Sequence, residues 1–308
     1  MSENTIETVT VSVLTYNSSR YVIETLESIK AQTYPNLILQ ICDDCSTDNT
    51  IRVCQQWIDK NRSRFVKSKL ITSEHNTGVS GNSNRSWDAC ETIYIKEIAG
   101  DDKLLPNCID DNMQFIEEHP DAVFVFSRIK ILGNDVEWNK KIEKMFDYSC
   151  FSLTSDQQLD WFLRCCNFVP ASTCFANISK IREHNIRNDE RIPLLEDIPK
   201  WINALWKGIT LYFFDKETVE YRVHESSLST CHKQNVLFRQ SLEMFFMLYT
   251  YPYIYSVDRE HAMALLYGKV SDLWRYKNMV QKNIFYRIYV RMRLWGGRVK
   301  RMIIRKLG

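Results

Sequence analysis

The chain has 308 residues, of which 44% are hydrophobic and 25% are charged, and its 40 Lys and Arg nearly balance its 38 Asp and Glu. This composition excludes a disordered chain and can supply one large hydrophobic core or two smaller ones. The N-terminus has no basic stretch followed by an apolar one, so we expect no secretory signal and reduced thiols for the ten cysteines. The longest apolar and aromatic stretch, 245–255, is too short to span a bilayer.

Strand and helix patterns alternate along the first 130 residues. The expected strands are 8–16, 37–44, 65–72, 92–102 and 121–132, and the expected helices are 21–32, 48–59, 80–91 and one that begins at 106 and ends before 119. Such alternation predicts a mainly parallel sheet with helices on both faces. Ligands of these sheets bind beyond the carboxyl ends of the strands.

Two acidic pairs stand at predicted strand ends. Asp43 and Asp44 end the second strand, and Asp101 and Asp102 end the fourth, so we expect both pairs to face one crevice. A carboxylate there can accept hydrogen bonds from a nucleotide base or ribose, and a second can hold a divalent cation against a diphosphate. Taken alone, the first pair could equally consist of turn residues.

The cysteines that flank the first pair suggest a different site. Cys42 and Cys45 have the Cys-x-x-Cys spacing of thiol and zinc sites. A zinc site would need two further ligands, and no second close-spaced pair of Cys or His stands at a suitable place. We therefore expect the aspartates, and not the thiols, to carry the chemistry.

Five segments, in this order, resemble the family 2 glycosyltransferases. They are VSVLTYNSSRYVIETLESIKAQTYPNLILQICDDCSTDNT, HNTGVSGNSNRSWDAC, IAGDDKLLP, LLEDIPKW and VEYRVHESSLS. The resemblance covers residues 8–224 and implies the α/β GT-A (nucleotide-diphosphosugar transferase) fold, a Rossmann-like mixed sheet flanked by helices. It implies a transferase domain at 1–230, with 1–102 binding the nucleotide-sugar and 103–230 forming the acceptor part. Residues 231–308 would then be a helical, basic and aromatic C-terminal extension.

The resemblance also implies roles for individual residues. The donor would contact Thr15, Tyr16, Asn17, Asp43, Asp44, Asn76, Gly78, Asn84, Asp101 and Arg222. Asp102 would bind Mn²⁺ or Mg²⁺, with His224 as a second candidate ligand from a loop that closes the site. A hard cation prefers carboxylate oxygen and would neutralise charge that develops on the departing nucleoside diphosphate.

Asp197, with Glu196 as its neighbour, is the candidate catalytic base. In the resembled enzymes one carboxylate takes the proton of an acceptor hydroxyl that attacks the anomeric carbon opposite the diphosphate, so the configuration inverts. Two adjacent carboxylates, if buried, raise each other's pKa, which suits a base that works near neutral pH. The alternative is that both only occupy the first turn of a helix, where acidic residues favour the helix dipole.

Three positions depart from the family pattern. Cys45 replaces a small Gly or Ser, Gly100 replaces an Asp, and Ser83 stands where many members carry Arg, so a phosphate contact would be missing or supplied by Arg85. The Gln-x-x-Arg-Trp motif of processive synthases is absent from the chain. We therefore expect an enzyme that adds a single sugar unit, and the resemblance favours a UDP-sugar donor and a hexosyl or N-acetylhexosaminyl unit.

Residues 273–308 carry eleven Lys and Arg and no Asp or Glu, interleaved with aromatic and aliphatic residues. The pattern favours an amphipathic segment on an anionic membrane surface. Packing on the domain is an alternative. A nucleic-acid partner is not expected, because no recognised binding motif accompanies the charge.

Family and basic segment together predict a lipid-linked glycan acceptor, a cytoplasmic location with peripheral contact to the inner leaflet, and a role in capsule or O-antigen synthesis. Two alternatives remain. A non-catalytic membrane-surface protein would be expected to have lost one of Asp43, Asp102 or Asp197. A sugar-nucleotide nucleotidyltransferase would be expected to carry a glycine-rich phosphate loop after the first strand, where NSSRYVIETL has no glycine.

Overall fold

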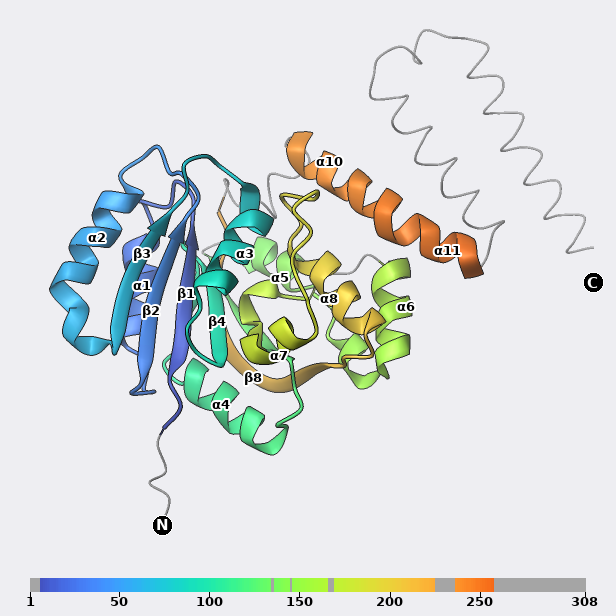
Figure 1. The fold of residues 1–308 in the computed structure, drawn as a ribbon, viewed down its shortest axis with the longest axis horizontal. Coiled ribbons are helices and arrows are strands. Elements are labelled where there is room, and N and C mark those ends of the chain that lie inside the picture. The colour runs from blue at the N-terminus through green and yellow to red at the C-terminus, as the bar shows by residue number, and fades with distance from the viewer. Residues whose placement is uncertain (1–5, 134–135, 145, 166–168, 225–235, 258–308) are drawn as a thin grey trace, which may run out of the picture. The chain divides into compact units, whose positions relative to one another are not determined.

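The computed structural model describes residues 6–133, 136–144, 146–165, 169–224 and 236–257 (Figure 1). The chain divides into two compact units, 1–249 and 250–308. The boundary predicted at 230 falls in 225–235, and the basic segment 273–308 falls in 258–308; both lie outside the described residues. No helix in the described part of the chain is long and apolar enough to cross a membrane.

An eight-stranded mixed sheet with the order β3-β2-β1-β4-β7-β6-β8-β5 organises the first unit. The strands are β1 (Val9–Thr15), β2 (Leu37–Asp43), β3 (Lys67–Thr72), β4 (Tyr94–Ala99), β5 (Lys103–Leu104), β6 (Phe124–Leu132), β7 (Phe175–Asn177) and β8 (Leu211–Arg222). The first four pair in parallel, as predicted. Beyond β4 the sheet becomes mixed, because β7 is antiparallel to both of its neighbours and β5 is antiparallel to β8.

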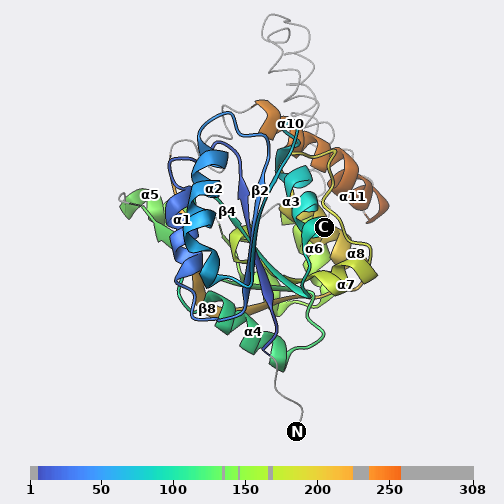
Figure 2. The same cartoon turned by 60° about the vertical axis from the view of Figure 1, so that its left-hand side comes forward.

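Helices cover both faces of the parallel part. The helices of the first unit are α1 (Val22–Lys30), α2 (Thr50–Asn61), α3 (Gly78–Ala89), α4 (Cys108–Glu118), α5 (Val136–Glu143), α6 (Ser155–Cys165), α7 (Ile178–Glu183), α8 (Asp197–Trp206) and α10 (Val236–Phe245). Figures 1 and 2 show α1 and α2 on one side of β1–β4, with α3 and α8 on the other. The described part of the second unit contains α11 (Tyr251–Val257).

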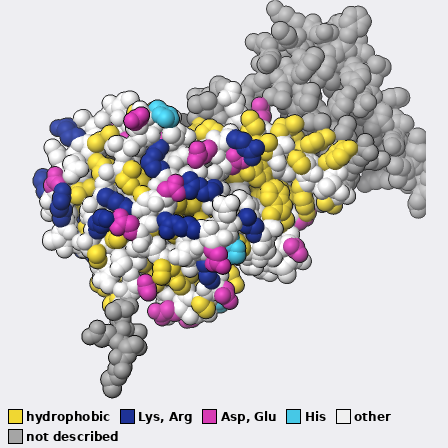
Figure 3. Space-filling view, in the orientation of Figure 1, with side chains coloured by type: hydrophobic (Ala, Val, Ile, Leu, Met, Phe, Trp, Pro, Cys, Tyr) yellow, Lys and Arg dark blue, Asp and Glu magenta, His cyan; other side chains and the backbone are white. Residues whose placement is uncertain are grey.

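The central strands are buried on both faces. Every residue of β2 is buried, and Val9, Val11 and Val13 of β1 have no exposed surface. Such continuous burial is typical of parallel strands that helices cover on both faces. In Figure 3 charged side chains of both signs are mixed over the surface of the first unit, and hydrophobic side chains gather around α10.

The register of the parallel strands positions the site. Thr15 pairs with Asp43 at the ends of β1 and β2, and Leu14 pairs with Ala99 at the end of β4. The turns that follow these strands therefore leave the sheet at one edge, as predicted.

Candidate active site

Asp43 lies at the end of β2 with no exposed surface. Its Oδ2 accepts hydrogen bonds from the hydroxyls of Thr15 (2.8 Å) and Ser46 (2.6 Å), and its Oδ1 accepts one from the Ser46 amide (2.8 Å). A carboxylate has about four acceptor positions, so one remains on Oδ1. The predicted contact with a nucleotide base would need that position, which has no exposed surface in this structure.

Hydrogen bonds join the turn after β1 to the turn after β2. The side-chain oxygen of Asn17 accepts hydrogen bonds from the amides of Thr47 (2.9 Å) and Asp48 (3.3 Å). Cys45 has a φ of 66°, in the left-handed region that favours glycine, which is one of the two residues that the resemblance leads us to expect there. Tyr16 is 50% exposed, so its ring is available to a ligand at this edge.

Asp44 holds the N-terminus of α3. Its carboxylate accepts hydrogen bonds from the amide (3.0 Å) and hydroxyl (2.6 Å) of Thr77 and from the Gly78 amide (2.8 Å). A carboxylate is favoured there because helix N-termini leave unsatisfied N–H groups. Arg85 pairs with the same carboxylate at 3.4 Å and donates to Thr77 Oγ1 and Asn82 Oδ1. Its guanidinium is thus already engaged, although we predicted it as a possible phosphate contact.

Of the remaining predicted donor residues, Gly78 and Asn84 lie on α3 against the loop at 188–195, and Asn76 lies just before the helix. Asn76 accepts a hydrogen bond from the Gly78 amide (3.0 Å). Gly78 has a φ of 78°, and a Cβ on it would lie 2.7 Å from the carbonyl oxygen of Pro193. The Asn84 amide group donates to the carbonyl of Asn188 (3.1 Å) and accepts from its N–H (3.0 Å). These contacts position the loop that leads into Glu196 and Asp197.

The second acidic pair lies against the end of β8. Asp102 is 3% exposed, and its Oδ1 accepts a hydrogen bond from the Arg222 amide (2.8 Å). His224 Nε2 lies 2.9 Å from Asp101 Oδ2, and Arg222 Nε donates to the carbonyl of Asp101 (2.8 Å). The structure therefore brings together two predicted pairs, Asp101 with Asp102 and Arg222 with His224, which lie about 120 positions apart in the chain.

Asp102 has an environment in which a bound divalent cation would change its protonation state. Burial, followed by the neighbouring Asp101, raises the pKa of Asp102 well above its ordinary value. A bound cation would favour the ionised carboxylate, and carboxylate oxygen is a preferred ligand of Mg²⁺. Within the described ranges no three His, Cys, Asp or Glu side chains converge on one metal position. In Mg²⁺ sites one or two carboxylates can bind the ion together with substrate phosphates and water, so Asp102 could hold the ion with a bound diphosphate.

Asp197 begins α8, and Glu196 occupies the preceding N-cap position. Asp197 is partly buried, and its Oδ1 accepts a hydrogen bond from the Ile198 amide (2.8 Å). Burial, followed by the Glu196 charge, raises the pKa of Asp197 to about 7. The amide contact agrees with the helix-dipole interpretation, while the raised pKa suits a general base near neutral pH, so the two roles are compatible.

The family model described as "Glycosyl transferase family 2" matches residues 10–179. The chain belongs to this family. It is 28% identical over 222 residues to the putative teichuronic acid biosynthesis glycosyltransferase TuaG of Bacillus subtilis, an alignment that covers 71% of this chain and 81% of that protein. It is also 28% identical to the Escherichia coli protein named UDP-Glc:alpha-D-GlcNAc-diphosphoundecaprenol beta-1,3-glucosyltransferase WfaP, over 76% of this chain and 84% of WfaP.

The fold of this glycosyltransferase is similar to the crystal structure of Staphylococcus aureus TarS 1–349 in complex with UDP-GlcNAc. The TM-score is 0.57 at 20% identity, over 82% of this chain and 76% of that one. The likeness confirms the predicted α/β fold with its mixed sheet and flanking helices.

Several residues that lie beside the predicted site residues, Tyr21, Glu24, Glu97 and Lys200, were not predicted from the sequence. The Arg222 side chain lies over the Tyr21 ring (4.7 Å) and pairs with Glu24 (2.6 Å) at the start of α1. Glu97 of β4 accepts hydrogen bonds from the Ser83 hydroxyl (2.9 and 3.1 Å), and Lys200 of α8 is 5% exposed. The three-residue spacings of Tyr21 to Glu24 and of Asp197 to Lys200 place each pair on one helix face, and this spacing is the signal that could have found them.

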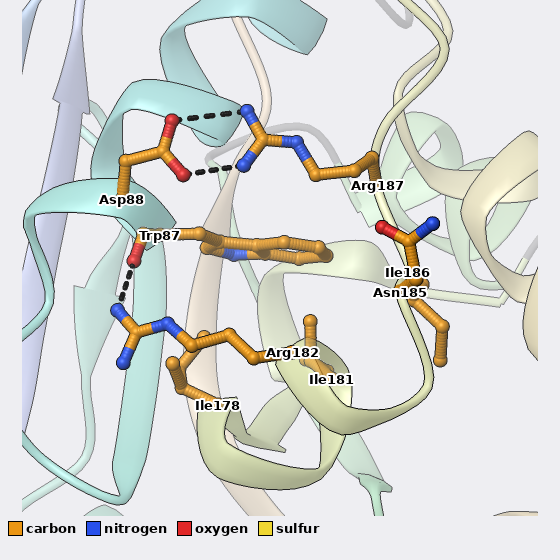
Figure 4. Close-up of a pocket in the computed structure, with 8 residues that line it drawn as sticks. All are labelled: Trp87, Asp88, Ile178, Ile181, Arg182, Asn185, Ile186 and Arg187. Atoms are coloured by element: carbon orange, nitrogen blue, oxygen red, sulfur yellow. Dashed lines mark hydrogen bonds and ion pairs between the residues drawn. The ribbon is translucent and has the colours of Figure 1, made fainter.

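A small hollow lies away from the strand ends. It has a volume of about 150 Å³ and lies between α3 and the α7 region, where Figure 4 shows the Trp87 indole between the side chains of Arg182 and Arg187. Arg187 pairs with Asp88, and Arg182 donates to the Trp87 carbonyl (2.9 Å). Trp87 lies nine residues beyond Gly78 along α3, which is about 13 Å. The hollow is smaller than the roughly 300 Å³ of typical ligand pockets.

Proposed function

We propose that this glycosyltransferase moves one sugar from a UDP-sugar to a hydroxyl of a lipid-linked glycan, with inversion and with Mn²⁺ or Mg²⁺, in bacterial surface polysaccharide synthesis. The observation that best supports the proposal is the pair of acidic turns at one sheet edge, combined with a carboxylate at Asp197 whose pKa is raised to about 7. The first feature suits a metal-bound diphosphate, and the second suits removal of a hydroxyl proton.

The donor would lie at the ends of β1, β2 and β4. Thr15 and Asp43 are buried and joined by a hydrogen bond, whereas Tyr16 is exposed beside them and offers a ring to the nucleotide base. The names of similar proteins support uridine nucleotides: WfaP is named for UDP-Glc, and TarS was crystallised with UDP-GlcNAc. We therefore propose hexosyl or N-acetylhexosaminyl transfer.

Asp102 would hold the cation, with His224 as the second candidate ligand. The ion would neutralise charge on the departing UDP. Asp197 would accept the proton of the acceptor hydroxyl while the acceptor oxygen bonds to the anomeric carbon and the bond from that carbon to the diphosphate breaks. A single displacement of this kind inverts the anomeric configuration.

A lipid-linked acceptor is supported by the name of WfaP, which specifies a diphosphoundecaprenol-linked sugar. The basic segment 273–308 would hold the enzyme at the inner leaflet by attraction to anionic lipid. Sedimentation of the full chain with lipid vesicles tests this membrane attachment. We expect the protein to sediment with anionic vesicles and not with neutral vesicles at the same salt concentration.

The first experiment measures UDP release from a panel of nucleotide-sugars with Mn²⁺, Mg²⁺ or EDTA. Native protein is compared with Asp102→Ala and Asp197→Asn, and Asp215→Asn is the control because its side chain is 69% exposed. We expect turnover of one UDP-sugar that requires metal, is lost in both site variants and persists in the control. Turnover that is indifferent to EDTA and to both site substitutions would reject the proposal.

A further inference from the structure

We propose that Lys200 is a positioning residue of the transferase, which sets a buried positive charge beside Glu97 and the Glu196–Asp197 pair and so keeps Asp197 able to accept a proton at neutral pH. The inference rests on the proposed function, because it assigns Lys200 a role in proton transfer at that site. Lys200 is not proposed to touch the substrate.

The environment of Lys200 is unusual for a lysine. The side chain is 5% exposed, and its ammonium lies 5.5 Å from the ring centre of Trp87 and 6.0 Å from that of Trp201. Among the described residues, none has an acceptor within hydrogen-bond distance of this ammonium. A buried charge without a direct partner is costly unless nearby opposite charges compensate it.

The structure supplies those charges from two elements. Ser83 and Trp87 are four residues apart on one face of α3; Ser83 bonds the Glu97 carboxylate and Trp87 contacts Lys200, so Glu97 and Lys200 lie against the same face. On α8, Asp197 precedes Lys200 by three residues, which places both side chains on one face of the first turn.

The charged and titratable groups that face Lys200 are Glu97 from β4, Glu196 and Asp197 from its own helix, and Cys174 from the segment before β7. Burial alone would lower the pKa of Lys200, but Glu97 and then Glu196 raise it above its ordinary value, so the ammonium stays charged. Burial raises the pKa of the Cys174 thiol to about 11, which leaves it neutral. The nearby Lys96 is engaged with the carbonyls of Ser172 and Cys174.

The carboxylates of Glu97, Glu196 and Asp197 therefore all interact with the ammonium of Lys200. Burial and Glu196 favour the protonated form of Asp197, and Lys200 opposes them. If the ammonium is removed, the pKa of Asp197 rises further, and less of it is deprotonated at neutral pH. Protonation of Asp197 costs activity because a protonated carboxylic acid cannot act as a general base.

The test compares Lys200→Met and Lys200→Arg with native protein, and Lys207→Met is the control because Lys207 is exposed at the end of the same helix. UDP release is measured from pH 5.5 to 9 with the UDP-sugar that the panel identifies. We expect Lys200→Met to shift the midpoint of kcat upward by about one pH unit, so that activity falls about tenfold below the midpoint and recovers at high pH. Lys200→Arg should restore the native midpoint, and the donor KM should change less than about twofold in each variant. An equal loss of kcat at every pH, or a change confined to KM, would overturn the inference.

A second readout does not require turnover. Thermal unfolding is followed across the same pH range for native protein and Lys200→Met, each with and without Asp197→Asn. We expect the pH-dependent difference between native and Lys200→Met to become smaller when Asp197 is replaced; the remaining difference comes from Glu97 and Glu196, which also face Lys200. If native protein releases no UDP from any nucleotide-sugar, the proposed function fails, whereas a Lys200 effect of unchanged size without Asp197 rejects this inference alone.

Discussion

Replacing Gly78 by alanine tests whether α3 positions the loop that carries the candidate base. Gly78 opens α3 with a φ of 78°, and a Cβ would lie 2.7 Å from both the Cβ and the carbonyl oxygen of Pro193. The left-handed conformation costs an alanine about 1–2 kcal/mol. The overlap with Pro193 adds about 1–3 kcal/mol, because backbone atoms must shift to relieve it. We expect Gly78→Ala to lower the free energy of unfolding by about 2–5 kcal/mol.

Gly208 provides a matched control. Its φ is 76°, but a Cβ there would meet no atom within 4 Å, so Gly208→Ala should cost about 1–2 kcal/mol for the conformation alone. Urea unfolding of both variants measures the difference, which should be about 1–3 kcal/mol. Because the overlap displaces the loop before Asp197, we also expect kcat to fall in Gly78→Ala and to stay near native in Gly208→Ala. Equal losses of stability in the two variants would refute the assigned contact with Pro193.

Three further predictions concern the charges of the site. Turnover should rise with pH through about 7, because Asp197 must be deprotonated to accept a proton. The raised pKa of Asp197 in the folded state also means that its protonated form stabilises the fold at low pH. Urea unfolding should show that this contribution to the free energy of unfolding declines between about pH 4 and 7 in native protein but not in Asp197→Asn. Mn²⁺ with UDP should raise the melting temperature of native protein, and EDTA or Asp102→Ala should remove that increase; an equal increase in the variant would argue against metal binding at Asp102. Glu24→Gln should lower the free energy of unfolding by less than about 1 kcal/mol, because the Glu24 side chain is 52% exposed. Arg222→Ala should weaken UDP binding measured by calorimetry. Equal UDP affinity in native protein and Arg222→Ala would contradict the donor role of Arg222.

Local pattern was sufficient for the longer strands and the helices up to β6, but it did not predict the two-residue strand β5. The β-branched run of β1 and the helical spacing of apolar residues in α1 each depend on neighbours a few positions away, so the sequence predicts them directly. The same pattern predicted Asp43 at the end of β2 and Asp102 beyond β4 at the same edge of the sheet, although β4 ends at Ala99 and Asp102 lies in the turn that follows. The family assignment likewise followed from short motifs in a fixed order.

The tertiary structure decided which partners those residues have. The antiparallel return of β7 and the pairing of β8 with β5 join segments that no local periodicity connects. The contact of Gly78 with Pro193 and the approach of Lys200 to Glu97 likewise join residues about 100 positions apart. Burial and neighbouring charge determine the pKa of Asp197, and both depend on how α8 packs against the rest of the unit. The sequence therefore determined the elements and the candidate chemistry, while the environment that tunes this chemistry exists only once distant segments have packed together.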